Sequence, residues 1–172
     1  MRVNNQRYQL QHNSILCNKM LTLLCSIGKI PVSFRSLTTL SSHRIFSQNE
    51  VNLFAELSGD KNIIHINEKA SEKYGGPIVH GTLMLGHVSG MVASTLPGAL
   101  LLHIETSFHH HLCVNEELVI AVSPVKIAQA TLHMDIKGVA NEKDIFSGSV
   151  DIGLTKSLLK KLKLENPELL KV

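Results

Sequence analysis

The feature that most constrains this chain is the stretch from Thr82 to Thr95, where apolar side chains leave no continuous polar face. Its polar members are Thr82, His87, Ser89, Ser94 and Thr95. A helix that is apolar nearly all round has to be buried nearly all round. At about 14 residues it is shorter than the roughly 20 needed to span a bilayer. We therefore expect a buried central helix, ended by Pro97-Gly98, and no membrane span.

Four segments after this helix alternate apolar and polar residues, as strands with one dry and one wet face do. A sheet with one wet face is expected to be antiparallel. Pro124 lacks an N–H group, so its strand needs an edge or a bulge there. One central helix followed by such a sheet predicts an α+β hot-dog fold, in which the sheet wraps around the helix. The dry positions are Leu102, Ile104, Thr106 and Phe108; Leu118, Ile120 and Val122; Leu132, Met134 and Ile136; and Phe146, Gly148, Val150 and Ile152.

Two shorter helices are expected before the central one. Residues 43–46 favour a short strand, after which Ser47 and Glu50 have the spacing of a capping box. Gly59 is a natural end for the helix that follows, because glycine adopts the left-handed conformation readily. A second helix is predicted over residues 68–74, ahead of a glycine pair.

Charge is distributed unevenly along the chain. No acidic residue precedes Glu50, whereas six of the 17 basic residues do, which leaves 11 basic against 14 acidic residues from Ile45 onward. The body is therefore slightly acidic and has no positive field for a polyanion. This excludes nucleic-acid binding. The six basic residues are Arg2, Arg7, Lys19, Lys29, Arg35 and Arg44.

An N-terminus that is basic, rich in serine and free of acids is typical of a mitochondrial transit peptide. The membrane potential draws positive charge inward. A secretory signal at Met20–Ile27 is one alternative, although this apolar run lies late in the chain and basic residues follow it. An unaddressed, disordered tail is another. We expect localisation in the mitochondrial matrix, with a leader over residues 1–41, one domain over 42–154 and a basic amphipathic tail over 155–172.

Two conspicuous groups are expected to be inert. His109, His110 and His111 are consecutive, and adjacent strand residues point to opposite faces, so the three cannot converge on one ion without distortion. We predict no metal and no cofactor. Cys113 is the one cysteine after the leader, so no disulfide can form within the body, and a small buried apolar side chain is the expected role.

Two motifs carry the chemistry. Asp60-Lys61-Asn62-Ile63-Ile64-His65 follows the first helix, and Ile78-Val79-His80-Gly81 opens the central one. The sequence from about Phe46 to Leu154 resembles the MaoC-like (R)-specific enoyl hydratase/dehydratase family, whose signature is Asp-x-Asn-Pro-x-His followed by an apolar pair and His-Gly. Its organisation is similar to the mitochondrial hydroxyacyl-thioester dehydratases of that family. Ile63, His111 and Asn115 depart from the pattern, where the family usually has Pro, Pro and Gly.

The resemblance implies the roles of the site residues. Asp60 and His65 would be the acid/base pair that adds water to an enoyl thioester or removes it from a hydroxyacyl thioester. Asn62 would support the loop or the water. Gly81, at a helix start, would offer an unpaired N–H to the thioester oxygen. Taken singly, each motif is weak: Asp-x-Asn is a common turn, and a lone His65 or His80 is more often structural.

The substrate is expected to be an acyl thioester on an acyl carrier protein or CoA. Its chain would lie beside Leu83, Met84, Val88 and Met91, and the family implies a homodimer. The lysines of the tail would be a solvated face or a dock for an acidic carrier. Two alternatives remain: a non-catalytic acyl-thioester-binding protein, and a thioesterase, against which the lack of Asp, Glu, Asn and Gln in residues 82–95 counts.

Overall fold

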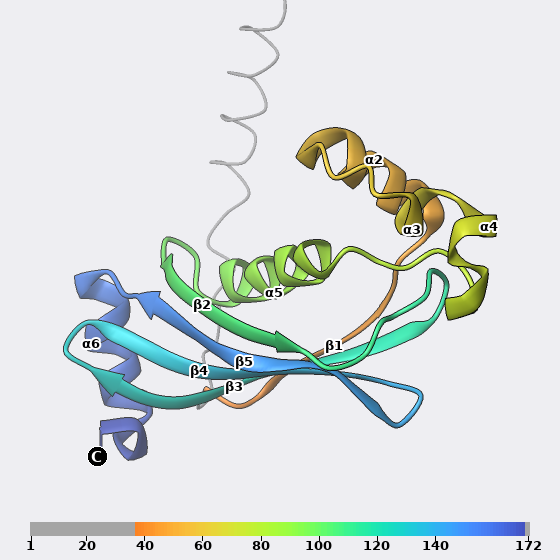
Figure 1. Ribbon diagram of the computed structural model, residues 1–172. Coiled ribbons are helices and arrows are strands. Elements are labelled where there is room, and N and C mark those ends of the chain that lie inside the picture. Colours follow the sequence, from red (N-terminus) through yellow and green to blue (C-terminus); the bar gives the residue numbers. More distant parts are fainter. Residues whose placement is uncertain (1–36, 171–172) are drawn as a thin grey trace, which may run out of the picture. The chain divides into compact units, whose positions relative to one another are not determined.

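The computed structural model describes residues 37–170, so the predicted leader lies almost entirely outside the described residues. The described chain forms a five-stranded antiparallel sheet in the order β1-β3-β4-β5-β2. One long helix lies along one face of this sheet (Figure 1). The α+β hot-dog prediction is confirmed. The strands are β1 (Leu40–Ile45), β2 (Leu100–Phe108), β3 (Glu117–Ala128), β4 (Thr131–Ala140) and β5 (Lys143–Gly153).

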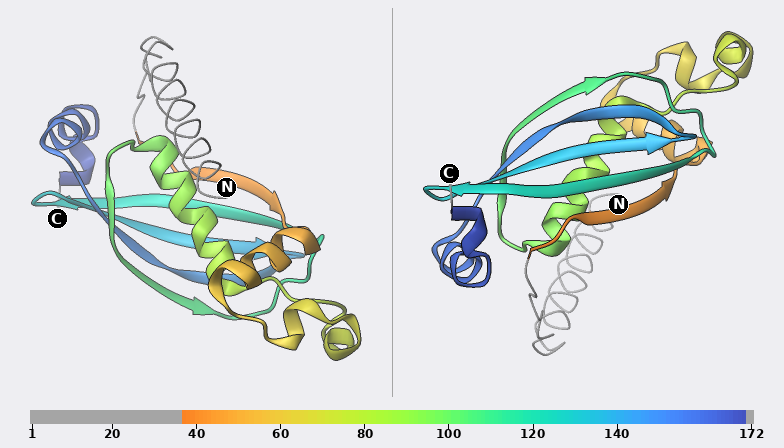
Figure 2. Two further views of the ribbon diagram at one scale, coloured as in Figure 1. Left: turned by 90° about the horizontal axis from the view of Figure 1, so that it is seen from above. Right: turned by 90° about the horizontal axis from the view of Figure 1, so that it is seen from below.

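Helix α5 (Gly81–Thr95) is the predicted central helix, and Figure 2 shows it crossing the strands from above and from below. Its buried residues are Met84, Val88 and Val92, which recur every four positions and form one stripe against the sheet. The expectation of burial nearly all round is therefore wrong for a single chain. The sheet covers one face of α5 and leaves the remaining faces partly exposed.

The segment before α5 follows its local signals closely. In helix α2 (Gln48–Ser58) both halves of the predicted capping box are present, and Gly59 ends the helix with φ 78°. The expected second helix is split into α4 (Glu68–Ser71) and the 3₁₀ turn η1 (Glu72–Tyr74). A further one-turn helix, α3 (Ile63–Ile66), was not predicted, and it matters for the site.

Strand β2 forms one edge of the sheet and is largely exposed. Leu100 and Leu102 are 66% and 58% exposed, although the alternation placed Leu102 on the dry face. A register shift between Leu101 and His103 interrupts the alternation there. The predicted irregularity at Pro124 is confirmed, because β3 shifts register against β4 immediately after it.

The tail forms helix α6 (Lys156–Glu165) and the 3₁₀ turn η2 (Pro167–Leu170). Leu162 and Leu169 are buried, so one side of the tail packs against the domain. Figure 1 shows α6 at the end of the sheet opposite to α3 and α4. Among residues 37–170, no helix is both long and apolar enough to cross a membrane.

Candidate active site

The turn after α2 positions the two predicted acid/base residues. Asp60 accepts a hydrogen bond from the Asn62 backbone N–H at 3.3 Å, which makes an Asx-type turn. The Asn62 side chain then caps α3 by accepting from the Ile64 N–H at 3.4 Å. The segment that holds His65 is thus a capped one-turn helix, and Asn62 shapes its backbone. His65 lies within that turn, so its position follows from the cap.

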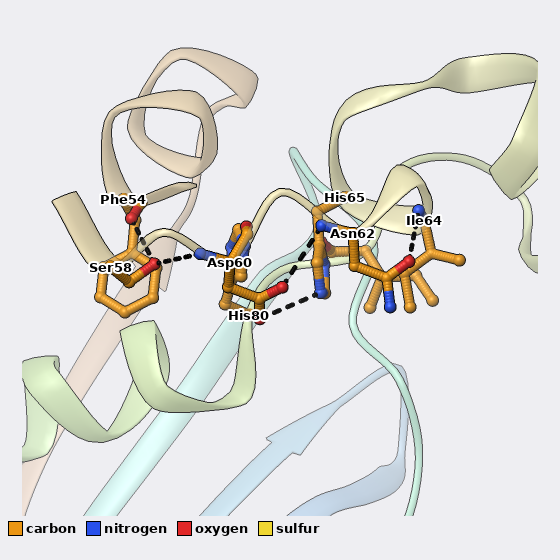
Figure 3. Close-up of polar contacts among 8 residues, drawn as sticks. Phe54, Ser58, Asp60, Asn62, Ile64, His65 and His80 are labelled. Carbon is orange, nitrogen blue, oxygen red and sulfur yellow. Dashed lines mark hydrogen bonds and ion pairs between the residues drawn. The ribbon is translucent and has the colours of Figure 1, made fainter. Parts of the chain in front are cut away.

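Asp60 and His65 face each other across a short gap (Figure 3). His65 Nε2 and Asp60 Oδ2 are 3.9 Å apart. His65 Nδ1 lies 2.7 Å from the Ile78 carbonyl oxygen, and because a carbonyl only accepts, Nδ1 carries the proton. In its neutral form, His65 then presents the lone pair of Nε2 toward the carboxylate. Two acceptors at this spacing can share one water, which donates a hydrogen to each.

His80 contacts both Asp60 and His65, which the sequence did not predict. It is 1% exposed, and its Nε2 lies 3.0 Å from the Asp60 carbonyl oxygen. Its ring stacks on His65 with centroids 3.8 Å apart and contacts Phe54 at 5.0 Å. Burial lowers the pKa of His80, and the opposing effect of the Asp60 carbonyl is smaller. The apolar-His-Gly motif, which contains His80, was the sequence signal that could have indicated its place in the site.

A cavity of about 670 Å³ lies beside the Gly75-Gly76 turn, and Asp60 does not line it. The cavity of about 600 Å³ that contains Asp60 and His65 is the candidate active site. Gly81 and Met84, at the start of α5, also line this cavity. The other lining residues are Ile78, Val79, Thr82, Phe108, His109, His110, His111 and Leu112.

Gly81 is crowded by an aromatic ring. A Cβ atom built there would lie 2.6 Å from Cζ of Phe108, which is 49% exposed and sits at the end of β2. The absence of a side chain at Gly81 therefore makes room for Phe108 in this structure. The oxyanion role of its N–H stays a prediction, and Phe108 joins the site as a residue that sequence reasoning missed.

The four predicted acyl-chain residues do not line one cavity. Met84 borders the active-site cavity, whereas Met91 borders a separate groove of about 530 Å³ between α5 and β1. That groove also holds Ser42 and His87, whose side chains are hydrogen bonded at 3.0 Å. Val88 is buried against the sheet, and Leu83 is half-buried. That the acyl chain lies beside all four residues remains a prediction.

The three consecutive histidines have separate partners. His109 Nε2 bonds to Ser147 Oγ at 2.7 Å, His110 Nδ1 to the Asp144 carbonyl at 2.8 Å, and His111 Nε2 to the Tyr74 carbonyl at 3.2 Å. They secure the loop at the cavity rim to three different places. This loop follows the end of β2, so the strand alternation expected for the three histidines does not apply to them.

Cys113 is half-buried in the same loop. Its thiol donates to the Tyr74 carbonyl at 3.2 Å. Burial, assisted by the nearby Glu116, raises the pKa of the Cys113 thiol. A raised pKa keeps the thiol protonated, so the group is poorly nucleophilic and a packing role fits it.

Asp60, His65 and His80 are close enough to suggest a metal centre, since each offers an atom within 4.8 Å of the others. The rings of His65 and His80, however, are stacked with an interplanar angle of 24°. Nitrogen lone pairs lie in the ring plane, and two stacked rings lie in nearly parallel planes, so one ion cannot lie close to both planes and accept both lone pairs. The arrangement fits proton transfer better than metal coordination.

Comparisons with known proteins identify the family and the fold. Residues 28–145 match the family model described as the MaoC like domain. A search of curated proteins found no match. Among solved structures, a protein of Archaeoglobus fulgidus is similar, with 22% identity, a TM-score of 0.65, and coverage of 86% of this chain and 99% of that one.

Two further structures share the fold. An (R)-hydratase of A. caviae involved in PHA biosynthesis has 23% identity, a TM-score of 0.65, and coverage of 72% of this chain and 99% of its own. The ChsH1–ChsH2 complex of Mycobacterium tuberculosis has 12% identity, a TM-score of 0.64, and coverage of 72% and 100%. The chain belongs to the MaoC-like dehydratase family, whose model spans more than half of it.

Proposed function

We propose that this protein catalyses the reversible dehydration of (3R)-3-hydroxyacyl thioesters to trans-2-enoyl thioesters. The observation that carries the proposal is the Asp60–His65 pair, whose facing acceptor atoms are 3.9 Å apart inside a cavity of a MaoC-like domain. A general base within reach of a bound water, or one water away, is what hydration requires. The structural similarity to an (R)-hydratase supports a hydration or dehydration reaction.

The chemistry follows from the two acceptors. A water held between His65 Nε2 and Asp60 Oδ2 would attack C3 of the enoyl thioester, forming the C3–O bond. The pair takes one proton from that water while the C2–C3 π electrons move toward the thioester carbonyl. The same proton then passes to C2, which completes addition on one face. Dehydration is the reverse, and an N–H at Gly81 would stabilise the charge on the thioester oxygen.

We further propose that the chain acts as a mitochondrial hydroxyacyl-thioester dehydratase of type 2, in mitochondrial fatty acid synthesis, on acyl-carrier-protein or CoA thioesters. Support comes from the acid-free basic N-terminus and the Asp-x-Asn-x-x-His and His-Gly motifs. A reporter fused to residues 1–45 should enter the matrix, and replacing Arg35 and Arg44 with Glu should weaken import; secretion of the reporter would contradict it.

The central test is hydration of enoyl thioesters by the full-length chain. Crotonyl and longer trans-2-enoyl groups on CoA and on a carrier protein are supplied, and loss of the enoyl absorbance is followed. Stereochemical analysis should find the (3R)-hydroxyacyl product. Saturable binding of these thioesters without turnover would instead favour a non-catalytic binding protein. Release of free acid and thiol would favour a thioesterase.

We propose that the protein assembles as a homodimer through β2. This edge strand exposes Leu100, Leu101, Leu102 and Phe108, which are between 44% and 66% exposed. An apolar edge strand with unpaired backbone groups needs a partner or a cover. A second copy would continue the sheet and cover the exposed sides of α5. Light scattering after size exclusion should give twice the mass of the chain, and a monomer would contradict the proposal.

A further inference from the structure

His80 is placed between the two catalytic candidates and the body of the protein. Its Nε2 lies 3.0 Å from the Asp60 carbonyl oxygen, and its ring stacks 3.8 Å from that of His65 (Figure 3). Phe54 on α2 contacts the ring as well, with centroids 5.0 Å apart. One residue at the start of α5 therefore touches the backbone of Asp60 and the side chain of His65.

These contacts fix the tautomer of His80. The Asp60 carbonyl can only accept, so His80 Nε2 carries a proton and donates it. Its Nδ1 is buried and has no hydrogen-bond partner among the described residues. Protonating Nδ1 would bury an unpaired N–H and a charge next to His65, which costs free energy. The titratable groups that face the ring are Asp60 and His65.

We propose that His80 is a positioning residue that acts through its Nε2–H bond to Asp60 and its stack on His65. The inference rests on the proposed hydration activity and deepens it. The bond ties the Asp60 backbone to α5, and the stack holds the His65 ring in the plane that its bond to Ile78 requires. Together the two contacts keep the water-binding gap at one width.

A neutral His80 leaves Asp60 and His65 as the groups that change charge during the reaction. Because its remaining nitrogen is buried and unpaired, a proton taken from water goes to Asp60 or His65. The lowered pKa of His80, caused first by burial, agrees with this geometry. A positioning role therefore predicts an effect on turnover more than on substrate binding.

Two substitutions separate the hydrogen bond from the stack. His80→Phe keeps a flat ring but removes the donor, whereas His80→Gln keeps an N–H near the position of Nε2. The full-length His80→Phe protein should lose about tenfold in kcat with KM changed less than about twofold, since one neutral hydrogen bond is worth up to about tenfold. His80→Gln should stay within about threefold of wild type. His87→Phe, a change of a half-buried histidine on the same helix, is the matched control and should leave kcat unchanged.

Histidine-ring nitrogen spectra provide a readout independent of turnover. From about pH 8 to pH 6, His80 should remain the neutral Nε2–H tautomer, and the His65 signals should move more in His80→Gln, which loses the stacked ring, than in His80→Phe, which keeps one. Normal kcat in folded His80→Phe, equal loss in both variants, or an Nδ1–H tautomer would each overturn the inference. If His80→Phe does not fold, His80→Gln and the wild-type spectra decide. Absence of hydration by wild type would sink the proposed function, while the spectra would still judge the contact to His65.

Discussion

Helix α5 carries two histidines with similar local properties and different surroundings. His80 precedes its first turn, and His87 lies about two turns further on. Burial lowers the pKa of each, and each makes one hydrogen bond, to the Asp60 carbonyl and to the Ser42 hydroxyl respectively. Both lie near a cavity or groove.

The surroundings of the two histidines differ in one respect: within the described part of the chain, only His80 lies next to a further pair of titratable side chains, Asp60 and His65. Next to His80, the turn after α2 brings a carboxylate and another imidazole to 3.9 Å. Next to His87, β1 supplies a serine hydroxyl and Arg44, which further lowers the pKa of His87. Burial and one hydrogen bond are therefore common structural properties of a histidine. A base facing a second acceptor across a water-sized gap is what distinguishes the candidate active site.

The largest effect on activity is expected from substituting Asp60 or His65. Asp60→Asn and His65→Gln should each reduce hydration about 10²- to 10⁴-fold, the range of general acid–base groups. The double variant should be little worse than either single one, because the two residues act on one water. Steady-state kinetics with a crotonyl thioester measure this, with circular dichroism to verify folding. Near-normal hydration by folded Asp60→Asn would end the assignment.

A side chain at Gly81 should lower activity at least about tenfold. Gly81→Val would meet the Phe108 ring, since a Cβ alone lies 2.6 Å from it, and would obstruct the thioester as well. Adding Phe108→Ala relieves the ring clash and should restore any lost stability but not the activity. Thermal unfolding and kinetics on both proteins separate the two effects. Recovery of activity in the double variant would show that Gly81 serves only to accommodate Phe108.

Chain-length selection should distinguish the two cavities. Met84 borders the active-site cavity and Met91 the groove between α5 and β1. Met84→Trp should therefore reduce kcat/KM on long enoyl thioesters several-fold more than on crotonyl thioester, whereas Met91→Trp should leave that ratio unchanged. Equal loss on every chain length in Met84→Trp would remove Met84 from the acyl site. A changed ratio in Met91→Trp would extend the acyl site to the groove.

The smallest effect is expected at the control histidine, and it concerns stability. A histidine with a lowered folded pKa is neutral in the folded chain and takes up a proton on unfolding. The stability it contributes is full above its unfolded pKa of about 6.5 and falls as the pH drops toward the folded value. The loss of unfolding free energy between about pH 7.5 and pH 5 should be smaller in His87→Gln than in wild type, with hydration unchanged. Chemical denaturation at both pH values measures it.

The local signals in the sequence were sufficient for most elements. Ser47 and Glu50 cap α2, Gly59 ends it, and the bulge follows Pro124, because hydrogen bonds between near neighbours and the missing proline N–H decide these features. The Asp60–His65 spacing is also a local feature, because the Asx-type turn at Asp60 leads directly into the capped turn that holds His65. Helix α6 likewise ends at Glu165, just before Pro167, which has no backbone N–H to continue the helix.

Which faces of the helices and strands pack together depends on contacts between residues far apart in the chain. Periodicity could not tell that α5 buries a single stripe, or that Met84 and Met91 face different cavities, because every turn of that helix is apolar. It could not place His80 behind Asp60, since that contact joins residues 20 positions apart and depends on how α2 and α5 pack. The local hydrogen bonds and the available chemical groups follow from the sequence, because they involve near neighbours in the chain. Which of those groups share a site follows from packing between segments that are far apart in the sequence.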